Sequence, residues 1–270
     1  MIINRATDQQ KSSTLKFTMT PKIYIMAVLL ILALVGAANP ADSKGILNIG
    51  VAVFAASVLD LMVGLFQNRN RLFPDAGIIT GLIIALVLGS NVSWYITLIA
   101  TVIALLSKHI IKIKRKPFFN PAAFGLLAVF LLFSSDQSWW GAFTSLPSWF
   151  LFAILVIGFL VTDRVNKFPQ VLAYLSVYFG LALITGFLGS TTAGDLLRNP
   201  LINSALFLAF FMLTDPPTSP SSTRDQIIFG VIAGGVTAGI YLEFGGLVFF
   251  LIGLLVANAY NVLRLLLTSK

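Results

Sequence analysis

The stretch RLFPDAGIITGLIIALVL, residues 71–88, opens with a charge and a proline and then stays apolar only as far as Leu88. Residues 198–213, RNPLINSALFLAFFML, repeat this design later in the chain. A bilayer core about 30 Å thick needs roughly 20 apolar residues per helix, so both runs are short for a crossing. Paired short segments opened by Pro predict an inverted repeat with a site near the middle of the membrane. The alternative is two ordinary, slightly tilted helices in a thin region of the bilayer.

The composition of the chain is that of a membrane protein. Of its 270 residues, 57% are hydrophobic and only 10% are charged, whereas soluble domains average about 25% charged residues. Such a chain cannot cover its surface with polar groups, so most of that surface must face lipid. The sequence has no Walker loop, no dinucleotide fingerprint and no Gly-x-Ser-x-Gly motif. A soluble enzyme is therefore not expected.

Apolar segments recur along the whole chain. They predict an all-α integral membrane protein with about ten transmembrane helices. The segments are residues 22–38, 46–66, 76–89, 92–107, 120–134, 148–162, 169–188, 201–213, 226–242 and 246–265.

Basic residues collect in every second connection between these segments. The other connections carry only Lys44 and Arg198. Because positive residues gather in cytoplasmic loops, we expect a multi-pass protein of the plasma membrane with both termini in the cytoplasm. The basic connections contain Arg5, Lys11, Lys16, Arg69, Arg71, Lys108, Lys112, Lys114, Arg115, Lys116, Arg164, Lys167, Arg224 and Lys270.

The chain is expected to form one membrane domain. Residues 1–20 are polar and lack helical periodicity, which predicts a cytoplasmic tail before the transmembrane domain of residues 21–270. An odd number of crossings in each half makes the second half enter from the opposite side, so pseudo-repeats are expected at about 21–135 and 147–266. A cleaved signal peptide is the alternative for the first segment, but its basic lead and its apolar run are long for one.

The chain has no Cys and a single histidine, His109. Disulfides, Cys-ligated iron–sulfur clusters, thiolate metal sites and multi-histidine metal sites are therefore excluded. The net charge of +8 is explained by the cytoplasmic connections, so nucleic-acid binding is not expected. His109 adjoins Lys108 at the inner surface, where we expect an interfacial polar residue rather than a proton carrier.

Asp60 lies inside an apolar segment, in Val-Leu-Asp60-Leu-Met-Val-Gly. A charge near the bilayer centre costs about 2.5–3.5 kcal/mol or more, so the carboxylate must face the bundle, pair with a cation or be protonated. One interpretation is a relay for protons or cations. The other is a structural carboxylate near the cytoplasmic end that pairs with Arg69 or Arg71.

Other polar residues adjoin predicted helix ends. Asp75 follows Pro74, and Asp215 lies in the Pro-rich run from Leu213 to Pro220. Both fit a capping role, because Asp accepts hydrogen bonds from free N–H groups. The prolines break a helix at membrane depth and free its carbonyl groups.

Two further motifs begin or flank the middle segments. Asn120 and Pro121 fit an N-cap followed by a first-turn proline. Trp139, Trp140 and Trp149 flank an outer loop, where anchors of an aromatic belt are expected.

Several strings together resemble one known family. They are Pro74-Asp75-Ala-Gly-Ile-Ile-Thr80-Gly81-Leu, Lys108-His-Ile with Phe119-Asn120-Pro121-Ala122, and Phe210-Phe-Met-Leu-Thr214-Asp215-Pro216 followed by Arg224 and Phe229-Gly230. In order and spacing they are similar to the D-type membrane component of the Rnf electron-transport complex, RnfD. They are equally similar to the B-type membrane component of the sodium-translocating NADH:quinone oxidoreductase, NqrB. The resemblance runs from about residue 45 to 265.

The resemblance implies a ten-helix inverted repeat of five helices and five, similar in fold to urea transporters. It implies a subunit that passes electrons through flavins and helps to couple them to Na⁺ or H⁺ movement. The partners implied are other membrane subunits and flavoprotein or ferredoxin-type subunits.

Members of this family carry FMN on a Thr of a Ser-Gly-Ala-Thr type motif, in a long loop after the fifth helix. Here that loop is only Ser134 to Pro147 and the motif is absent. Thr144 has different neighbours, so the attachment site is not carried over and covalent FMN is not expected. A noncovalent flavin, FMN or riboflavin, stays open, with Trp139 and Trp140 as stacking candidates beside their alternative role as belt anchors.

These observations give two sets of candidate residues and no catalytic, metal or covalent-FMN residue. For an ion or coupling path the candidates are Asp60, Asp75, Thr80 and Asp215, and for substrate or flavin binding they are Asn120, Pro121, Thr214, Trp139 and Trp140.

Two functions remain in competition. The first is a membrane subunit of a redox-driven ion-translocating complex, which supplies scaffold and orientation while a cofactor performs the redox chemistry. The second is a stand-alone channel or facilitator for a small solute on the same fold, because a fold does not fix a function. Loss of the flavin loop favours the second function.

Overall fold

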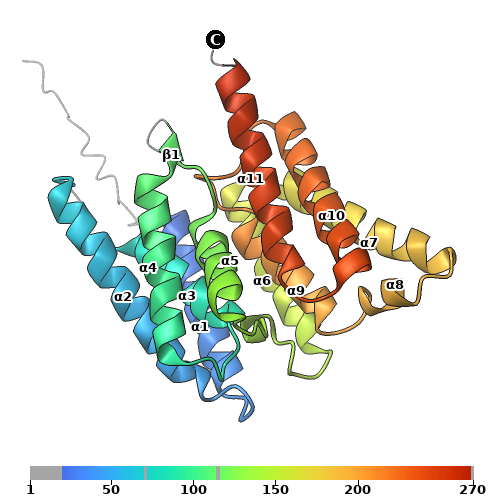
Figure 1. The fold of residues 1–270 in the computed structure, drawn as a ribbon, viewed down its shortest axis with the longest axis horizontal. Coiled ribbons are helices and arrows are strands. Elements are labelled where there is room, and N and C mark those ends of the chain that lie inside the picture. The colour runs from blue at the N-terminus through green and yellow to red at the C-terminus, as the bar shows by residue number, and fades with distance from the viewer. Residues whose placement is uncertain (1–19, 70–71, 114–115, 269–270) are drawn as a thin grey trace, which may run out of the picture.

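The structure is a computed structural model, and it describes residues 20–69, 72–113 and 116–268. Helices dominate these residues, and Figure 1 shows α1 to α4 on one side of the molecule and α7, α8 and α10 on the other. The helices are α1 (Pro21–Ala37), α2 (Gly45–Phe66), α3 (Asp75–Val87), α4 (Trp94–Ile110), α5 (Pro121–Phe133), η1 (Trp140–Ala142), α6 (Phe150–Val165), α7 (Phe168–Phe187), α8 (Thr191–Asp195), α9 (Leu201–Phe207), η2 (Leu208–Met212), α10 (Thr223–Phe244) and α11 (Phe249–Thr268).

Every predicted apolar segment coincides with a helix to within a few residues. The helices α2, α7, α10 and α11 are long and apolar enough to cross a membrane, while α1, α3, α4, α5 and the continuous pair α9–η2 are shorter and also apolar. An all-α fold with membrane-spanning helices is therefore confirmed. The small hairpin of β1 (Lys112–Ile113) and β2 (Lys116–Pro117) was not predicted, since its basic residues indicated only a loop.

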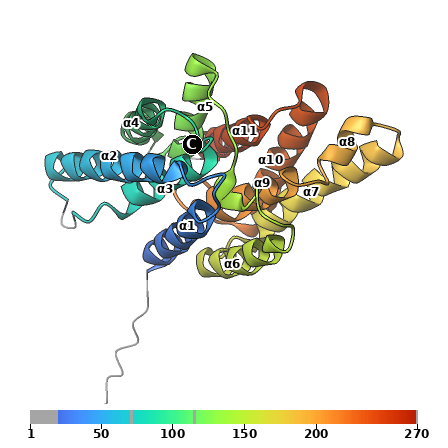
Figure 2. The same ribbon diagram turned by 90° about the horizontal axis from the view of Figure 1, so that it is seen from below.

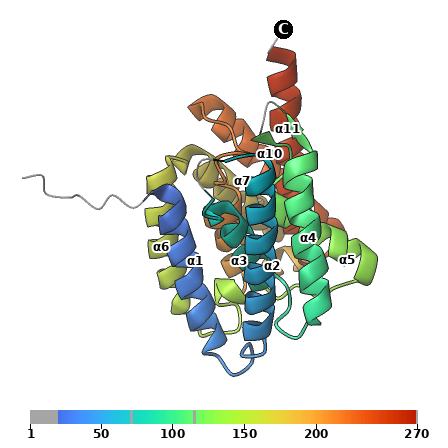
Figure 3. The ribbon, with the colours of Figure 1, turned by 90° about the vertical axis from the view of Figure 1, so that its left-hand side faces the viewer.

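In the part of the chain from α1 to α5, the connections between helices lie at two opposite ends of the molecule. Figures 1 and 3 show the end of α4 and the end of α11 at one end, and the connection from α1 to α2 at the other. Figure 2 shows α5 and α11 side by side near the middle, where they are in contact. The predicted basic connections after α2 and after α4 therefore share one end, which we call the basic end. The opposite end is called the outer end.

Both short segments form short helices. α3 begins at Asp75 and ends at Val87, after which Leu88 is extended and pairs with Gln137 in an isolated antiparallel bridge. α9 continues into η2, a π-helix, and the helical chain stops before the Pro-rich run. These broken helices leave carbonyl groups without intrahelical partners, so other groups must bind them.

Glycines let several helices approach backbone to backbone. A Cβ atom on Gly81 of α3 would lie 2.7 Å from the carbonyl oxygen of Ala52 in α2, and one on Gly230 of α10 would lie 2.3 Å from that of Gln170 in α7. Gly230 thus provides the absence of a side chain that this close helix packing requires.

Candidate functional site

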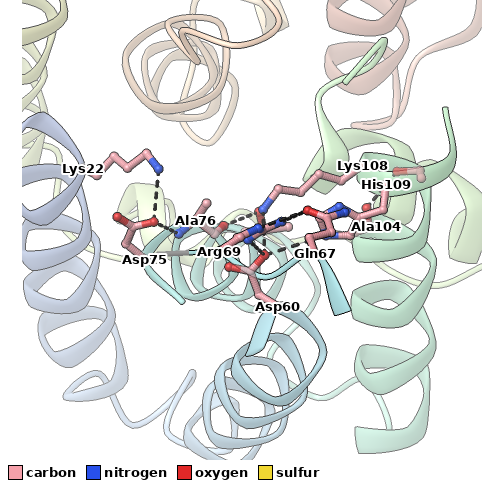
Figure 4. A network of polar contacts seen from close by, with 11 residues as sticks. Lys22, Asp60, Gln67, Arg69, Asp75, Ala76, Ala104, Lys108 and His109 are labelled. Carbon is pink, nitrogen blue, oxygen red and sulfur yellow. Dashed lines mark hydrogen bonds and ion pairs between the residues drawn. The ribbon is translucent and has the colours of Figure 1, made fainter. Parts of the chain in front are cut away.

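Asp60 is the centre of a buried charged cluster near the C-terminal end of α2. Its side chain is 3% exposed, and its Oδ1 atom lies 3.4 Å from Arg69 Nη1, 3.3 Å from Lys108 Nζ and 3.7 Å from His109 Nε2. Figure 4 shows these groups converging on the carboxylate. Pairing with Arg69 is one of the two pairings weighed from the sequence, and Arg71 lies outside the described residues.

Packing of α2 against α3 and α4 fixes this cluster. A Cβ atom on Gly77 of α3 would lie 2.8 Å from Asp60 Cβ, so only glycine lets α3 pass so close to the carboxylate. Lys108 and His109 come from the last turn of α4. His109 was expected to be an interfacial polar residue. In the structure it lies beside the buried carboxylate of Asp60, which the sequence did not indicate.

The cluster carries more positive than negative charge. One carboxylate faces the cationic groups of Arg69 and Lys108 and an imidazole. These cations balance the negative charge of the buried Asp60 carboxylate.

Asp75 forms a second pair at the same end of the molecule. Its Oδ1 atom accepts hydrogen bonds from Lys22 Nζ at 3.1 Å and from the N–H of Ala76 at 2.7 Å. The carboxylate thus binds a first-turn N–H, as the capping prediction requires, although Pro74 holds the N-cap position. Thr80 donates its hydroxyl to the Ala76 carbonyl at 2.9 Å, so its polar atom is engaged within α3.

The carbonyl groups freed after η2 are bound by amide side chains from distant helices. Asn120 Nδ2 donates to the Met212 carbonyl at 3.2 Å, and Gln170 Nε2 donates to the Leu213 carbonyl at 2.8 Å. These bonds satisfy the end of the broken helix inside the protein, where an unpaired carbonyl would be costly.

Asn120 joins three elements. Its Oδ1 atom accepts from the N–H of Ala123 at 3.1 Å, its own N–H donates to Asn258 Oδ1 in α11 at 2.8 Å, and its side-chain amide binds the end of η2. Asn120 as N-cap and Pro121 as the first helical residue of α5 are confirmed. The hydrogen bonds of Asn120 hold α5, α11 and η2 together.

The Pro-rich run is anchored further along in the same way. Asn258 and Asn261 of α11 both donate to the Thr218 carbonyl, at 3.3 and 3.1 Å. Lys167, in the connection between α6 and α7, donates to the Pro220 carbonyl. Burial lowers the pKa of Lys167 to about 8, and the nearby charge of Asp215 partly opposes this shift.

Asp215 and Thr214 are engaged within their own turn. Asp215 Oδ2 accepts from Thr218 Oγ1 at 2.8 Å, and the Asp215 carbonyl accepts from Ser219 Oγ at 2.8 Å. The Thr214 hydroxyl donates to the Phe210 carbonyl at 2.6 Å. Asp215 therefore organises the turn that follows η2 instead of the start of a helix.

The belt prediction is wrong for Trp139 and Trp140, because both rings are buried in the protein core. Trp140 Nε1 donates to the Ala85 carbonyl of α3 at 2.8 Å, so this ring closes the end of the broken helix. Trp149 is 70% exposed, as a belt residue should be. Trp residues in a connection between helices are consistent both with an exposed outer loop and with a loop that folds into the core, so the sequence could not separate the two.

A buried carboxylate at the outer end escaped the sequence analysis. Asp42 is 5% exposed and accepts hydrogen bonds from Ser90 at 3.0 Å, from Asn39 at 3.2 Å and from Ser145. Its three partners are neutral, and no basic group of the described ranges pairs with it. Asp42 follows a helix in a polar stretch, where the sequence gives no sign of burial.

The surroundings of Trp139 and Trp140 do not fit a stacked flavin. Trp139 packs edge-on against Phe207 and Phe250, with ring centroids 6.1 and 5.2 Å away, and it is fully buried. Neither indole has an exposed face. Residues predicted for flavin binding are thus divided between two places: Asn120 and Thr214 adjoin η2, while the two Trp side chains lie in the loop before α6.

A broken helix in each part of the chain and a buried carboxylate cluster at the basic end define a helical membrane protein of the kind built around discontinuous helices. Compared with known families, the chain matches the family described as NQR2, RnfD, RnfE over residues 5–149 and 140–260. The match covers most of the chain, so the protein belongs to this family.

Individual relatives agree with this assignment. The chain is 22% identical over 265 residues to the D component of the proton-translocating ferredoxin:NAD(+) oxidoreductase complex of Clostridium ljungdahlii, covering 77% of this chain and 80% of the relative. It is 38% identical over 77 residues to the D component of an ion-translocating oxidoreductase complex of Haemophilus influenzae. That second match covers 28% of this chain and 21% of the relative.

Proposed function

We propose that this protein is a membrane subunit of a redox-driven ion-translocating oxidoreductase complex. The observation that carries the proposal is the family match, which extends over both parts of the chain. The two relatives, each named as the D component of such a complex, support it. The partners would be other membrane subunits and flavoprotein or ferredoxin-type subunits.

The architecture proposed for this function is an inverted repeat of five helices and five, similar to urea transporters, within one membrane domain. Its pseudo-repeats are about residues 21–135 and 147–266. Matching contacts support it: α1 packs on α3 as α6 packs on α9 and η2, and α4 packs on α2 and α5 as α10 packs on α7 and α11. The protein would lie in the plasma membrane with its basic end and both termini in the cytoplasm, in agreement with the positive-inside rule.

The coupling path is proposed to pass the cluster around Asp60. Thr80, Thr214 and Asp215 use their side-chain polar atoms within their own elements, whereas Asp60 draws its partners from α4 and from the connection after α2. The positive excess of the cluster repels a metal cation, so this geometry does not favour a bound Na⁺ beside Asp60.

Flavins of the complex are proposed to be bound by the partner subunits or at an interface with them. The buried rings of Trp139 and Trp140 support this placement, since they leave no face for a flavin. This chain then contributes the membrane scaffold and the ion path.

The proposal is tested by purifying the full chain in mild detergent from its own membranes. Flavoprotein subunits and the visible absorbance of flavin are expected to copurify. In membrane vesicles, Asp60→Asn is expected to stop redox-driven ion movement while the complex still assembles. Asp163→Asn is the matched control, because Asp163 lies exposed at the end of α6. Full ion movement in the assembled Asp60→Asn complex would reject the path at Asp60.

A solute channel that acts alone is the second candidate, and the short loop of residues 134–147 favours it. The result that would establish it is a colourless chain without partners that passes a small solute in liposomes. The buried aromatic side chains of Trp139, Phe207 and Phe250 between the broken helices argue against an open channel in this conformation.

A further inference from the structure

A polar stripe runs along the buried face of α7. Gln170, Tyr174 and Tyr178 follow one another at intervals of four residues, so they lie on one side of the helix. All three side chains are fully buried. Polar residues inside a membrane helix are costly and usually serve a function, so this stripe requires an explanation.

Most polar atoms of the stripe have no protein partner. Gln170 Nε2 binds the Leu213 carbonyl, but Gln170 Oε1 and the hydroxyls of Tyr174 and Tyr178 make no hydrogen bond of normal geometry within residues 20–69, 72–113 and 116–268. Buried polar groups of native proteins are nearly always bonded to protein or to ordered water.

The helix packed on this face adds more such atoms. Thr237 of α10 is fully buried and its hydroxyl also lacks a partner of normal geometry in the described ranges, although it lies near the hydroxyl of Tyr174. Gly253 of α11 faces it, and a Cβ atom there would lie 2.0 Å from Thr237 Oγ1. Glycine therefore preserves the space that the Thr237 hydroxyl occupies.

The unpartnered atoms are arranged from the basic end toward the membrane centre. Gln170 lies in the first turn of α7, beside Lys167. Tyr178 is ten residues beyond Phe168, or about 15 Å further along the axis of α7. The ring of Phe250 lies 5.9 Å from that of Tyr178 and 5.2 Å from that of Trp139, whose indole N–H is also unpartnered in the described part of the chain.

We propose that Gln170, Tyr174, Thr237 and Tyr178 bind a file of internal water molecules that leads from the basic end to the middle of the membrane. Amide and hydroxyl groups can each join two waters, because a hydroxyl both donates and accepts. An ion fits less well, because none of these four side chains is charged. Internal waters of this kind normally make about three hydrogen bonds to otherwise unpaired groups.

This inference goes beyond the proposed function and does not depend on it. A water file that starts beside Lys167 and ends near Trp139 gives protons a route half-way across the membrane on a side of the molecule separate from Asp60. Its existence is a question about bound water, which is measured without partner subunits or redox turnover.

The direct test is radiolytic hydroxyl-radical footprinting of the full chain in nanodiscs, read by mass spectrometry. Waters held beside buried side chains give local radicals, so Tyr174 and Tyr178 are expected to be modified several-fold faster than Phe249. Phe249 is the matched control, since it is an equally buried aromatic residue in the adjacent helix. Equal, slow modification of all three residues would overturn the proposal.

A second test uses variants that remove only one hydroxyl. If Tyr174 and Tyr178 bind water, Tyr174→Phe and Tyr178→Phe break hydrogen bonds and lower the thermal midpoint of unfolding. If the hydroxyls have no partner at all, the same changes remove a desolvation penalty and raise the midpoint. Tyr95→Phe, at a 47% exposed residue, is the control and is expected to leave the midpoint unchanged. A raised midpoint in both buried variants would contradict the water file.

Discussion

Asp60 at the basic end and Asp42 at the outer end are both buried carboxylates, and the protein balances them in different ways. At the basic end Asp60 faces two cationic side chains and a histidine. At the outer end Asp42 is held by neutral groups of Ser90, Asn39 and Ser145. Both are almost inaccessible to solvent. Burial alone therefore does not distinguish a carboxylate in an ion network from one that is purely structural. The charge of its partners distinguishes them.

The hydrogen-bond partners of Asp60 are charged side chains, whereas the partners of Asp42 are neutral side chains from different loops. The donors to Asp42 come from the connections after α1, after α3 and after α5, so this carboxylate joins three turns of the outer end. Asp60 instead joins the ends of α2 and α4 with charges that must be balanced. Removal of either carboxylate is expected to reveal this difference.

The largest effect on stability is expected for Asp60→Asn. It leaves the buried ammonium of Lys108, whose side chain is 16% exposed, without its counter-ion. Breaking a buried pair in this way costs about 3 kcal/mol, near the low end of the range because Arg69 is partly solvated. Unfolding in mixed detergent micelles measures it. A loss smaller than that of Asp42→Asn would reverse the comparison.

A smaller loss is expected for Asn120→Ala, which uncaps α5 and leaves the Met212 carbonyl unbound. A lost cap costs about 1 kcal/mol and an unpaired buried carbonyl about 1 kcal/mol more. The matched variant at the outer end is Asn48→Ala, which loses a hydrogen bond of 2.9 Å to the Val92 carbonyl and removes no cap. Equal losses in the two variants would show that Asn120 does not link α5 to η2.

Asp42→Asn is expected to cost only about 1 kcal/mol, because an amide oxygen still accepts hydrogen bonds from neutral donors. The same unfolding measurement applies, repeated at low and high salt. Added salt should leave the loss unchanged, since no charge pair is broken at this end. A loss that falls strongly with salt would indicate a cation partner of Asp42.

Lys167→Gln is expected to change the pH dependence of stability. The pKa of Lys167 is about 8 in the folded chain, against about 10.4 in an unfolded one. Between these values the unfolded chain binds more protons, so the free energy of unfolding rises with pH. The variant should flatten this rise, whereas Lys44→Gln, at an exposed residue of the outer end, should keep it. An unchanged slope in Lys167→Gln would contradict the lowered pKa.

Local signals in the sequence predicted the helices and one partner of Asp60, Arg69. Apolar runs locate each helix, and Arg69 follows Asp60 closely enough for their pairing to be foreseen. The N-cap at Asn120 and its following proline are likewise local. These features depend on residues within a few turns of one another, which a single sequence displays.

Long-range partners could not be predicted. Lys108 is 48 residues from Asp60, and Asn258 is 138 residues from Asn120. Nothing in the spacing of such residues shows which helices pack together. Trp139 was misplaced for a related reason: its burial depends on Phe207 and Phe250, which lie far along the chain and bring the loop into the core.

The central claim is that the chain crosses the membrane with its basic connections on one side and the outer end on the other. Because the sequence has no Cys, single changes of Lys112, Ser221, Ser43 and Thr191 to Cys can be labelled with an impermeant maleimide in oriented vesicles. Lys112→Cys and Ser221→Cys should react only from the cytoplasmic side, and Ser43→Cys and Thr191→Cys only from the opposite side. Labelling of Lys112→Cys and Thr191→Cys from the same side would contradict the account.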